Sequence, residues 1–172
     1  MAALENLLGG PVDWDTHLPM KDARIRAGQQ GLDTMPGIRE LLAEARAAGV
    51  PCVVASSSQR SHVGGWLERT GLRDSFEFVR SRDDVERAKP FPDLFLSAAA
   101  GLGLEPSETL VLEDSSNGLR ASIAAGAPCV VVPSPVTLGS DFTGAAAILP
   151  TLEGVGLARL AEIHAGRGSG GV

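Results

Sequence analysis

From about Gly37 onward, short apolar runs alternate with longer segments of helical periodicity. The apolar runs predict strands at Pro51–Ala55, Phe76–Val79, Thr109–Leu112, Pro128–Val132 and, more weakly, Ala145–Leu149. The intervening segments predict helices at Ile38–Ala48, before Gly71, at Pro92–Leu102, Leu119–Ala125 and Val155–His164. Continuous apolar strands that alternate with helices are typical of a parallel sheet with right-handed crossovers. The pattern therefore predicts an α/β fold.

Residues 1–36 show a different pattern. Polar helical pieces such as Asp22–Gln30 are broken by Gly9-Gly10-Pro11, Pro19 and Gly31, and no convincing strand is present. We expect a separate small helical element here. The tail Gly166–Val172 (GRGSGGV) has the composition of a flexible end.

Composition narrows the classes of function. The 172 residues carry a formal charge of −6, and no Lys/Arg cluster suggests nucleic acid or an anionic membrane as a partner. No apolar stretch approaches the ~20 residues of a membrane helix, and the start lacks a signal-peptide pattern, so we expect a cytoplasmic protein. Cys52 and Cys129 begin apolar runs, which favours buried free thiols. The histidines are scattered and suggest no zinc site: His17, His62 and His164.

Polar residues at strand ends are the candidates for chemistry, because open parallel sheets bind ligands at the carboxyl ends of their strands. Ser56-Ser57-Ser58-Gln59-Arg60 follows the first strand. Hydroxyls and free backbone N–H groups at a helix start form a phosphate cradle. The alternative is that a serine simply caps the helix.

Two further features point to the same chemistry. Glu113 and Asp114 end a buried strand, where adjacent carboxylates are costly unless a cation such as Mg²⁺ offsets their charge. Asp114 or Ser115 could instead cap the next helix. Lys89 precedes a proline-flanked helix and could neutralise a phosphoryl group, or it could be an ordinary solvated lysine.

The order of these features resembles a known family. The segments VVASSSQR, AKPFPDLF and VLEDSSNGLRASIAAGAPCVVVP are similar to the second, third and fourth motifs of the haloacid dehalogenase (HAD) superfamily, and more narrowly to its β-phosphoglucomutase-like, sugar-phosphate phosphatase branch. The resemblance covers roughly Met35 to His164. It implies a HAD-like Rossmannoid three-layer core with a parallel sheet at residues 35–165, a partial helical cap at residues 1–34 and a flexible tail at residues 166–172.

The resemblance also implies residue roles. Ser56 would hold the transferring phosphoryl oxygen, Lys89 would stabilise its charge, and Glu113 and Asp114 would bind Mg²⁺ directly or through water. Ser57 and Arg60 would contact the substrate or its phosphate. The implied function is a Mg²⁺-dependent phosphatase or phosphomutase that acts on a small phosphorylated metabolite, a sugar phosphate.

The family's first motif has no convincing counterpart. It consists of an apolar strand followed by D-x-D, whose first aspartate is the nucleophile and whose second is the acid/base. Asp13-Trp14-Asp15-Thr16 has the spelling, but Gly9-Gly10-Pro11-Val12 precedes it where a strand is required. We therefore interpret it as a decoy and expect the nucleophile outside this chain. In the family this strand lies at the centre of the sheet, so the resemblance implies a gap between the strands that end at Ser56 and Glu113, to be filled by a missing amino-terminal segment or by self-association.

Three other functions share part of this pattern. A catalytically inactive phosphatase-like fragment, or a binding module, would retain the same clamp without the nucleophile. A response-regulator receiver also combines an acidic pair, a hydroxyl residue and a lysine, but in the opposite order along the chain. A dinucleotide-binding fold is disfavoured because Gly101-Leu102-Gly103 lies at a helix end and lacks the rest of the motif.

Overall fold

A computed structural model describes residue 13 and residues 33–166 of the chain. The chain divides between Asp33 and Thr34, and the fold below is that of the second unit. The predicted cap segment (residues 1–34), the helix at Asp22–Gln30 and the tail beyond Gly166 lie wholly or almost wholly outside the described residues. Within residues 33–166, no helix is both long enough and apolar enough to cross a bilayer.

Residues 33–166 form strands alternating with helices, as the sequence predicts. The strands are β1 (Val54–Ala55), β2 (Val79–Arg80), β3 (Val111–Glu113), β4 (Cys129–Val131) and β5 (Ala147–Ile148). The α-helices are α3 (Ile38–Ala47), α4 (Arg60–Thr70), α5 (Asp93–Leu102), α6 (Ser116–Ala125) and α7 (Leu157–His164). Short 3₁₀ turns lie at Arg73–Ser75, Arg82–Asp84 and Pro106–Glu108. Every element predicted for this part of the chain is therefore present.

The boundaries differ from the sequence prediction where neighbouring contacts set them. β2 overlaps the predicted strand only at Val79, because Phe76 directly follows a 3₁₀ turn and the paired residues of the two strands begin with Val54 opposite Val79. α6 starts three residues before the predicted Leu119, because Ser115 caps it. Hydrogen-bonding partners, which the apolar pattern does not specify, decide these ends.

The strands form two parallel sheets rather than one. β1 pairs with β2, with Val54 opposite Val79. The second sheet has the order β3–β4–β5, with Leu112 opposite Val130. The parallel direction agrees with the prediction, and among residues 33–166 the break lies between β1 and β3, where the gap was expected.

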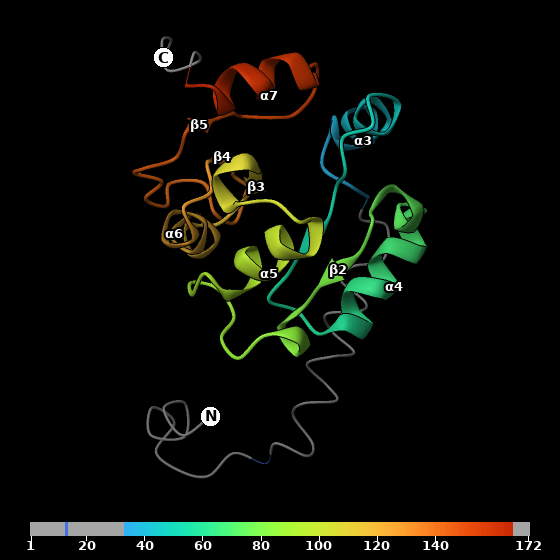
Figure 1. Ribbon diagram of the computed structural model, residues 1–172, viewed down its shortest axis with the longest axis vertical. Helices are drawn as coiled ribbons and strands as arrows, with labels where there is room; N and C mark the ends of the chain where they lie inside the picture. The colour runs from blue at the N-terminus through green and yellow to red at the C-terminus, as the bar shows by residue number, and fades with distance from the viewer. Residues whose placement is uncertain (1–12, 14–32, 167–172) are drawn as a thin grey trace. The chain divides into compact units, whose positions relative to one another are not determined.

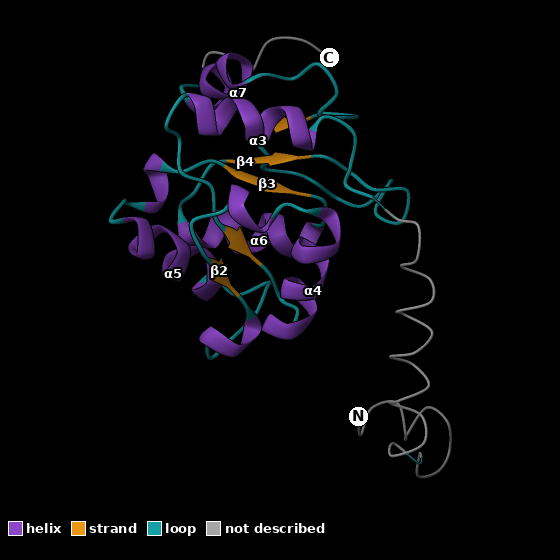
Figure 2. Cartoon of the chain, turned by 90° about the vertical axis from the view of Figure 1, so that its right-hand side faces the viewer, coloured by secondary structure: helices purple, strands orange, loops and turns teal. Residues whose placement is uncertain are grey.

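Successive residues of β4, and Val132 directly after it, pack alternately into two cores on opposite faces of the sheet. Cys129 and Val131 pack with Phe95 of α5 and Leu119 of α6. Val130 and Val132 pack instead with residues of α3 and α7: Leu41, Leu160 and Ile163. This division follows from the two-residue period of a strand. Figure 2 shows α3 and α7 on one side of β3 and β4 with α5 and α6 on the other, the three-layer arrangement that the resemblance implies.

Gly37 fixes the entry into α3. Its φ is 86°, and a Cβ there would lie 2.2 Å from the carbonyl carbon of Leu152. Only glycine combines this left-handed conformation with so close an approach of another backbone. From that start, α3 buries the predicted face of Leu41, Leu42 and Ala45.

Candidate active site

Lys89 joins the carboxyl ends of β1 and β3. Its ammonium donates a hydrogen bond to the Ala55 carbonyl oxygen at 2.9 Å and forms an ion pair with the carboxylate of Glu113. The Lys89 side chain is only 12% exposed and that of Glu113 only 7%. The ammonium also lies 4.7 Å from the ring centroid of Phe95. Lys89 is thus an ordered, largely buried cation, and the alternative of a solvated surface lysine is wrong.

The loop before α5 delivers Lys89 to this position. The Arg87 guanidinium makes a bidentate contact with the Asp93 carboxylate at the start of α5, with N–O distances of 2.9 and 3.2 Å. This contact joins the two ends of the loop. The bond between Lys89 and Pro90 is cis. Phe95, one turn into α5, is buried in the core shared with α6. The lysine is therefore held between a closed loop and a packed helix. Figure 1 shows this helix, α5, beside α6.

Glu113 and Asp114 lie at the end of β3 in different environments. The Glu113 carboxylate accepts hydrogen bonds from Ser115 Oγ at 3.1 Å and the Asp114 N–H at 3.3 Å, besides its pairing with Lys89. Asp114 is exposed. Its pKa is raised above the usual range, first because nearby protein atoms desolvate it and second because Glu113 is negative. A cation beside Asp114 would relieve this repulsion.

The helix-capping alternative at this position is settled in favour of Ser115. Ser115 is the N-cap of α6, and its Oγ accepts a hydrogen bond from the N–H of Gly118 at 3.1 Å. The Asp114 side chain is therefore not required as a cap. It remains a candidate ligand for a hard cation such as Mg²⁺.

The serine loop after β1 has its own hydrogen bonds. Ser56 Oγ accepts from the Ser58 N–H at 3.1 Å, whereas the N-cap of α4 is Gln59, which makes no side-chain capping bond. The alternative that a serine simply caps α4 is therefore wrong. Ser57 is exposed. Ser56 directly follows Ala55, whose carbonyl binds Lys89, so Ser56 and Lys89 lie at the same strand end.

Arg60 lies apart from this group. Its guanidinium pairs with Asp84 and donates to the Val79 carbonyl at 3.4 Å, and its backbone N–H donates to Asp83 at 2.8 Å. Hydrogen bonds from the Ser81 N–H and hydroxyl, and then the contact with Arg60, hold the pKa of Asp84 below its usual range. Within residues 33–166, the structure brings Lys89, Glu113 and the Ala55–Ser56 strand end together, but Arg60 is not recorded in contact with them.

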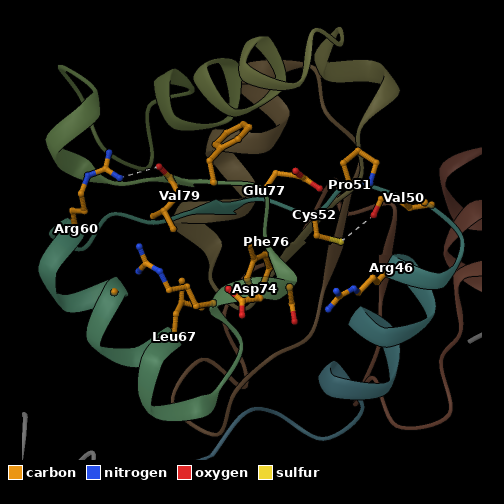
Figure 3. Close-up of a pocket in the computed structure, with 15 residues that line it drawn as sticks. Arg46, Val50, Pro51, Cys52, Arg60, Leu67, Asp74, Phe76, Glu77 and Val79 are labelled. Carbon is orange, nitrogen blue, oxygen red and sulfur yellow. Dashed lines mark hydrogen bonds between the residues drawn. The ribbon is translucent and has the colours of Figure 1, made fainter.

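Two cavities of this unit are lined by residues other than Lys89 and Glu113. A cavity of about 780 Å³ is lined by α3, α4 and the strand entries, including Arg46, Cys52, Arg60, Arg73 and Phe76. Figure 3 shows Arg60 at its rim, bonded to Val79. A smaller one of about 300 Å³ is bordered by Ser56, Ser58, His62 and Trp66.

Both cysteines are free thiols, as predicted, but only one of them is fully buried. Cys129 is buried, and burial raises the pKa of its thiol to about 12. Cys52 is half-buried, with its thiol pKa also raised by burial. No group of three or more His, Cys, Asp or Glu side chains suited to a metal occurs in the described part of the chain. His164 contacts the Ser107 carbonyl at 3.0 Å, and His17 lies outside the described residues.

Comparison with known proteins identifies the family. The sequence model of the haloacid dehalogenase-like hydrolases matches residues 12–132, well over half of the chain. This chain belongs to that family. The match begins upstream of Met35, where the motif resemblance starts, and includes the Asp13-Trp14-Asp15 segment.

Relatives within the HAD family share up to about two fifths of the aligned residues. YhcW of Bacillus subtilis, which is named as a phosphatase, is 38% identical over 134 residues, 78% of this chain and 61% of the relative. CbbY of Rhodobacter capsulatus is 37% identical over 169 residues, 92% of this chain and 73% of the relative. The chain thus spans between three fifths and three quarters of these two proteins.

One solved HAD structure contains a sugar phosphate. CbbY from Rhodobacter sphaeroides, crystallised as a variant in complex with xylulose-(1,5)bisphosphate, is 33% identical, with a TM-score of 0.75. The match covers 87% of this chain and 69% of that one. The fold and the sugar-phosphate phosphatase branch predicted from the motifs are therefore confirmed.

Sequence reasoning missed two residues that contact the site from α6. Ser115 was considered only as a cap, although its hydroxyl also holds Glu113. Gly118 was passed over, although a Cβ at this position would lie 2.0 Å from the Glu113 carboxylate carbon. A glycine inside the first turn of a predicted helix is the signal that could have found it, because glycine is unfavourable there without a local reason.

Proposed function

We propose that residues 33–166 form the core of a Mg²⁺-dependent HAD phosphatase or phosphomutase that acts on a small phosphorylated metabolite, a sugar phosphate. The observation that carries the proposal is Lys89, which is held between the end of β1 and Glu113 at the end of β3. A buried, oriented cation at the carboxyl edge of a parallel sheet suits an anionic ligand. The relatives named as a phosphatase and crystallised with xylulose-(1,5)bisphosphate support this class of substrate.

In this proposal the chain supplies an electrostatic clamp. A protonated lysine has three N–H donors, and two hydrogen-bond acceptors are recorded for Lys89 within residues 33–166. The third donor would bind a phosphoryl oxygen, with the Ser56 hydroxyl beside it. Ser57 is exposed at the same loop and would contact the rest of the substrate. Arg60 would do so only if its pairing with Asp84 were exchanged for the substrate.

The negative charge at the end of β3 suits Mg²⁺. Lys89 pairs with Glu113, while the pKa of the exposed Asp114 stays raised by desolvation and by Glu113, although Lys89 acts to lower it. Asp114 would be the principal ligand and Glu113 would act directly or through water, the remaining positions falling to water and the phosphate. The bound ion would supply positive charge to the phosphoryl oxygens.

The nucleophile is the part that the described residues do not provide. The family's reaction proceeds through an aspartyl-phosphate, which requires a carboxylate in line with the phosphorus. At the described strand ends, Glu113 is engaged by Lys89 and Asp114 is the metal candidate. We therefore place the nucleophile on a further strand between β1 and β3, and we regard Asp13 and Asp15 as a decoy.

Backbone geometry supports a strand at that place. The amides of Val54 and Ser56 bond to β2, so those of Val53 and Ala55 face the other way. On β3, the amide of Val111 and the carbonyl of Glu113 bond to β4 and its extension, so the backbone groups of Leu112 face away from β4. Within residues 33–166 these backbone groups have no recorded partner in another strand, and the Ala55 carbonyl accepts from Lys89. One inserted parallel strand would pair with both edges.

The proposal predicts that the 172-residue chain alone hydrolyses p-nitrophenyl phosphate or sugar phosphates negligibly with Mg²⁺ present. Loss of a positioned carboxylate removes a contribution that can reach several powers of ten in rate. A version extended at its amino end by an apolar strand and D-x-D should regain turnover. It should also form an acid-stable phosphoenzyme, and Asp114→Asn in that version should abolish Mg²⁺ binding measured by calorimetry.

The Asp13→Asn variant of the 172-residue chain is the control. Robust activity of the short chain that Asp13→Asn abolishes would overturn the placement of the nucleophile and assign it to Asp13, with Asp15 as acid/base. An extended protein that binds Mg²⁺ and phosphate without turnover would instead support the alternative, an inactive phosphatase-like binding module. Gel filtration of the short chain reports whether a second copy fills the gap.

A further inference from the structure

We infer that Gly118 and Ser115 are positioning residues, which set the Glu113 carboxylate against Lys89 and so orient the cation of the clamp. The inference rests on the proposed function for its purpose, but the contacts that carry it belong to this chain alone. Both residues lie at the start of α6, and neither is assigned a role by the motif resemblance.

Gly118 provides the space that Glu113 occupies. It is buried in the first turn of α6 with an ordinary negative φ, so its backbone conformation does not require glycine. A Cβ there would lie 2.0 Å from the carboxylate carbon and one oxygen of Glu113, and 2.5 Å from the other oxygen. These atoms form the far end of a flexible side chain. An added methyl would therefore displace the carboxylate rather than break the helix.

Ser115 holds the same carboxylate from the other side. Its hydroxyl donates to Glu113 Oε2 at 3.1 Å and accepts from the Gly118 N–H at 3.1 Å. The Ser115 hydroxyl therefore both caps α6 and orients the Glu113 carboxylate. Oε1 of Glu113 is then directed to Lys89, whose ammonium also binds the Ala55 carbonyl. The start of α6 is linked in this way to the end of β1.

The chain offers a direct measurement, because Lys21 is its only other lysine. The protein is acylated with sulfosuccinimidyl acetate, and peptide mass spectrometry measures the rate of acylation of the Lys89 amine. The acylation rate of Lys21 in the same sample serves as the internal reference. Glu113→Gln should raise the Lys89 rate on the order of ten-fold, since a charge-assisted bond is lost. Gly118→Ala and Ser115→Ala should raise it by a similar factor.

Two matched variants separate positioning from a general loss of structure. Gly65→Ala makes the same change inside α4, where a Cβ meets nothing within 4 Å, and should leave the Lys89 rate unchanged. Ser115→Thr keeps the hydroxyl and should restore the wild-type rate. Circular dichroism and thermal unfolding establish that each variant is folded.

An unchanged Lys89 rate in Gly118→Ala, while Glu113→Gln raises it, would overturn the role of Gly118. No response to Glu113→Gln would overturn the whole inference. If Gly118→Ala does not fold, the difference between Ser115→Ala and Ser115→Thr decides. None of these readouts uses turnover, so an inactive extended enzyme with the expected acylation pattern would count only against the proposed function.

Discussion

The two sheets of this unit differ in how completely they are buried. Val130 and Val131 of β4 are fully buried, and Cys129 is 2% exposed, with a core on each face. β1 and β2 have only two residues each, all half-buried, and a cavity of about 780 Å³ lies beside them. Yet the candidate site needs both sheets, because Lys89 contacts the end of β1 and the end of β3.

The contrast is sharpest on the side of β1 that faces β3. β4 has a strand on either side and a core on each face, whereas β1 pairs, within residues 33–166, with β2 alone. β1 and β3 are both edge strands among the described residues, and β1 is the shorter and less buried of the two. A strand inserted between β1 and β3 would complete the site and join the two sheets.

Matched leucine substitutions test the contrast most strongly. Leu119 of α6 is 2% exposed inside the shared core, whereas Leu67 of α4 borders both cavities. Leu119→Ala should cost about 4 kcal/mol of unfolding free energy and Leu67→Ala about 2 kcal/mol, the upper and lower parts of the usual range. Urea unfolding of the two variants measures the difference. Equal costs would contradict an unevenly packed core.

We expect a smaller effect on unfolding free energy from Asp84, in the turn after β2. The pKa of Asp84 is lowered chiefly by the hydrogen bonds from Ser81, so its carboxylate stabilises the folded chain. That contribution is fully present above the ordinary pKa of 3.8 and is lost as pH falls through the lowered folded value. Asp84→Asn should therefore destabilise the protein at pH 7 and have less effect in acid. A penalty that does not shrink as pH falls would contradict this linkage.

The sequence predicted the elements and the parallel direction because both follow from local apolar periodicity, as with Leu41, Leu42 and Ala45 on α3. It also pointed to Lys89, Glu113 and Asp114, because their motifs resemble a family. It did not predict that Lys89 and Glu113 pair, that Arg60 binds Asp84, or that Gly118 makes room for Glu113. These depend on tertiary contacts between residues far apart in the chain, which no local pattern encodes.

The strand ends show the same limit on a smaller scale. The apolar run Pro51–Ala55 predicts five strand residues, but a ladder forms only at Val54–Ala55, where β2 supplies partners. On the gap side, Val53 and Ala55 have backbone groups directed away from β2. An apolar run indicates which residues are buried. Whether those residues form a strand depends on a neighbouring strand that supplies hydrogen-bonding partners.

Amide hydrogen exchange tests the open edge most directly. In the 172-residue chain, the amides of Ala55 and Leu112 should exchange much faster than those of Val54 and Val111, which bond to neighbouring strands. In the version extended by an apolar strand and D-x-D, Ala55 and Leu112 should become as protected as their neighbours. If Ala55 and Leu112 are already as protected as Val54 and Val111 in the 172-residue chain, the edge is not open, and the proposed place of the nucleophile is contradicted.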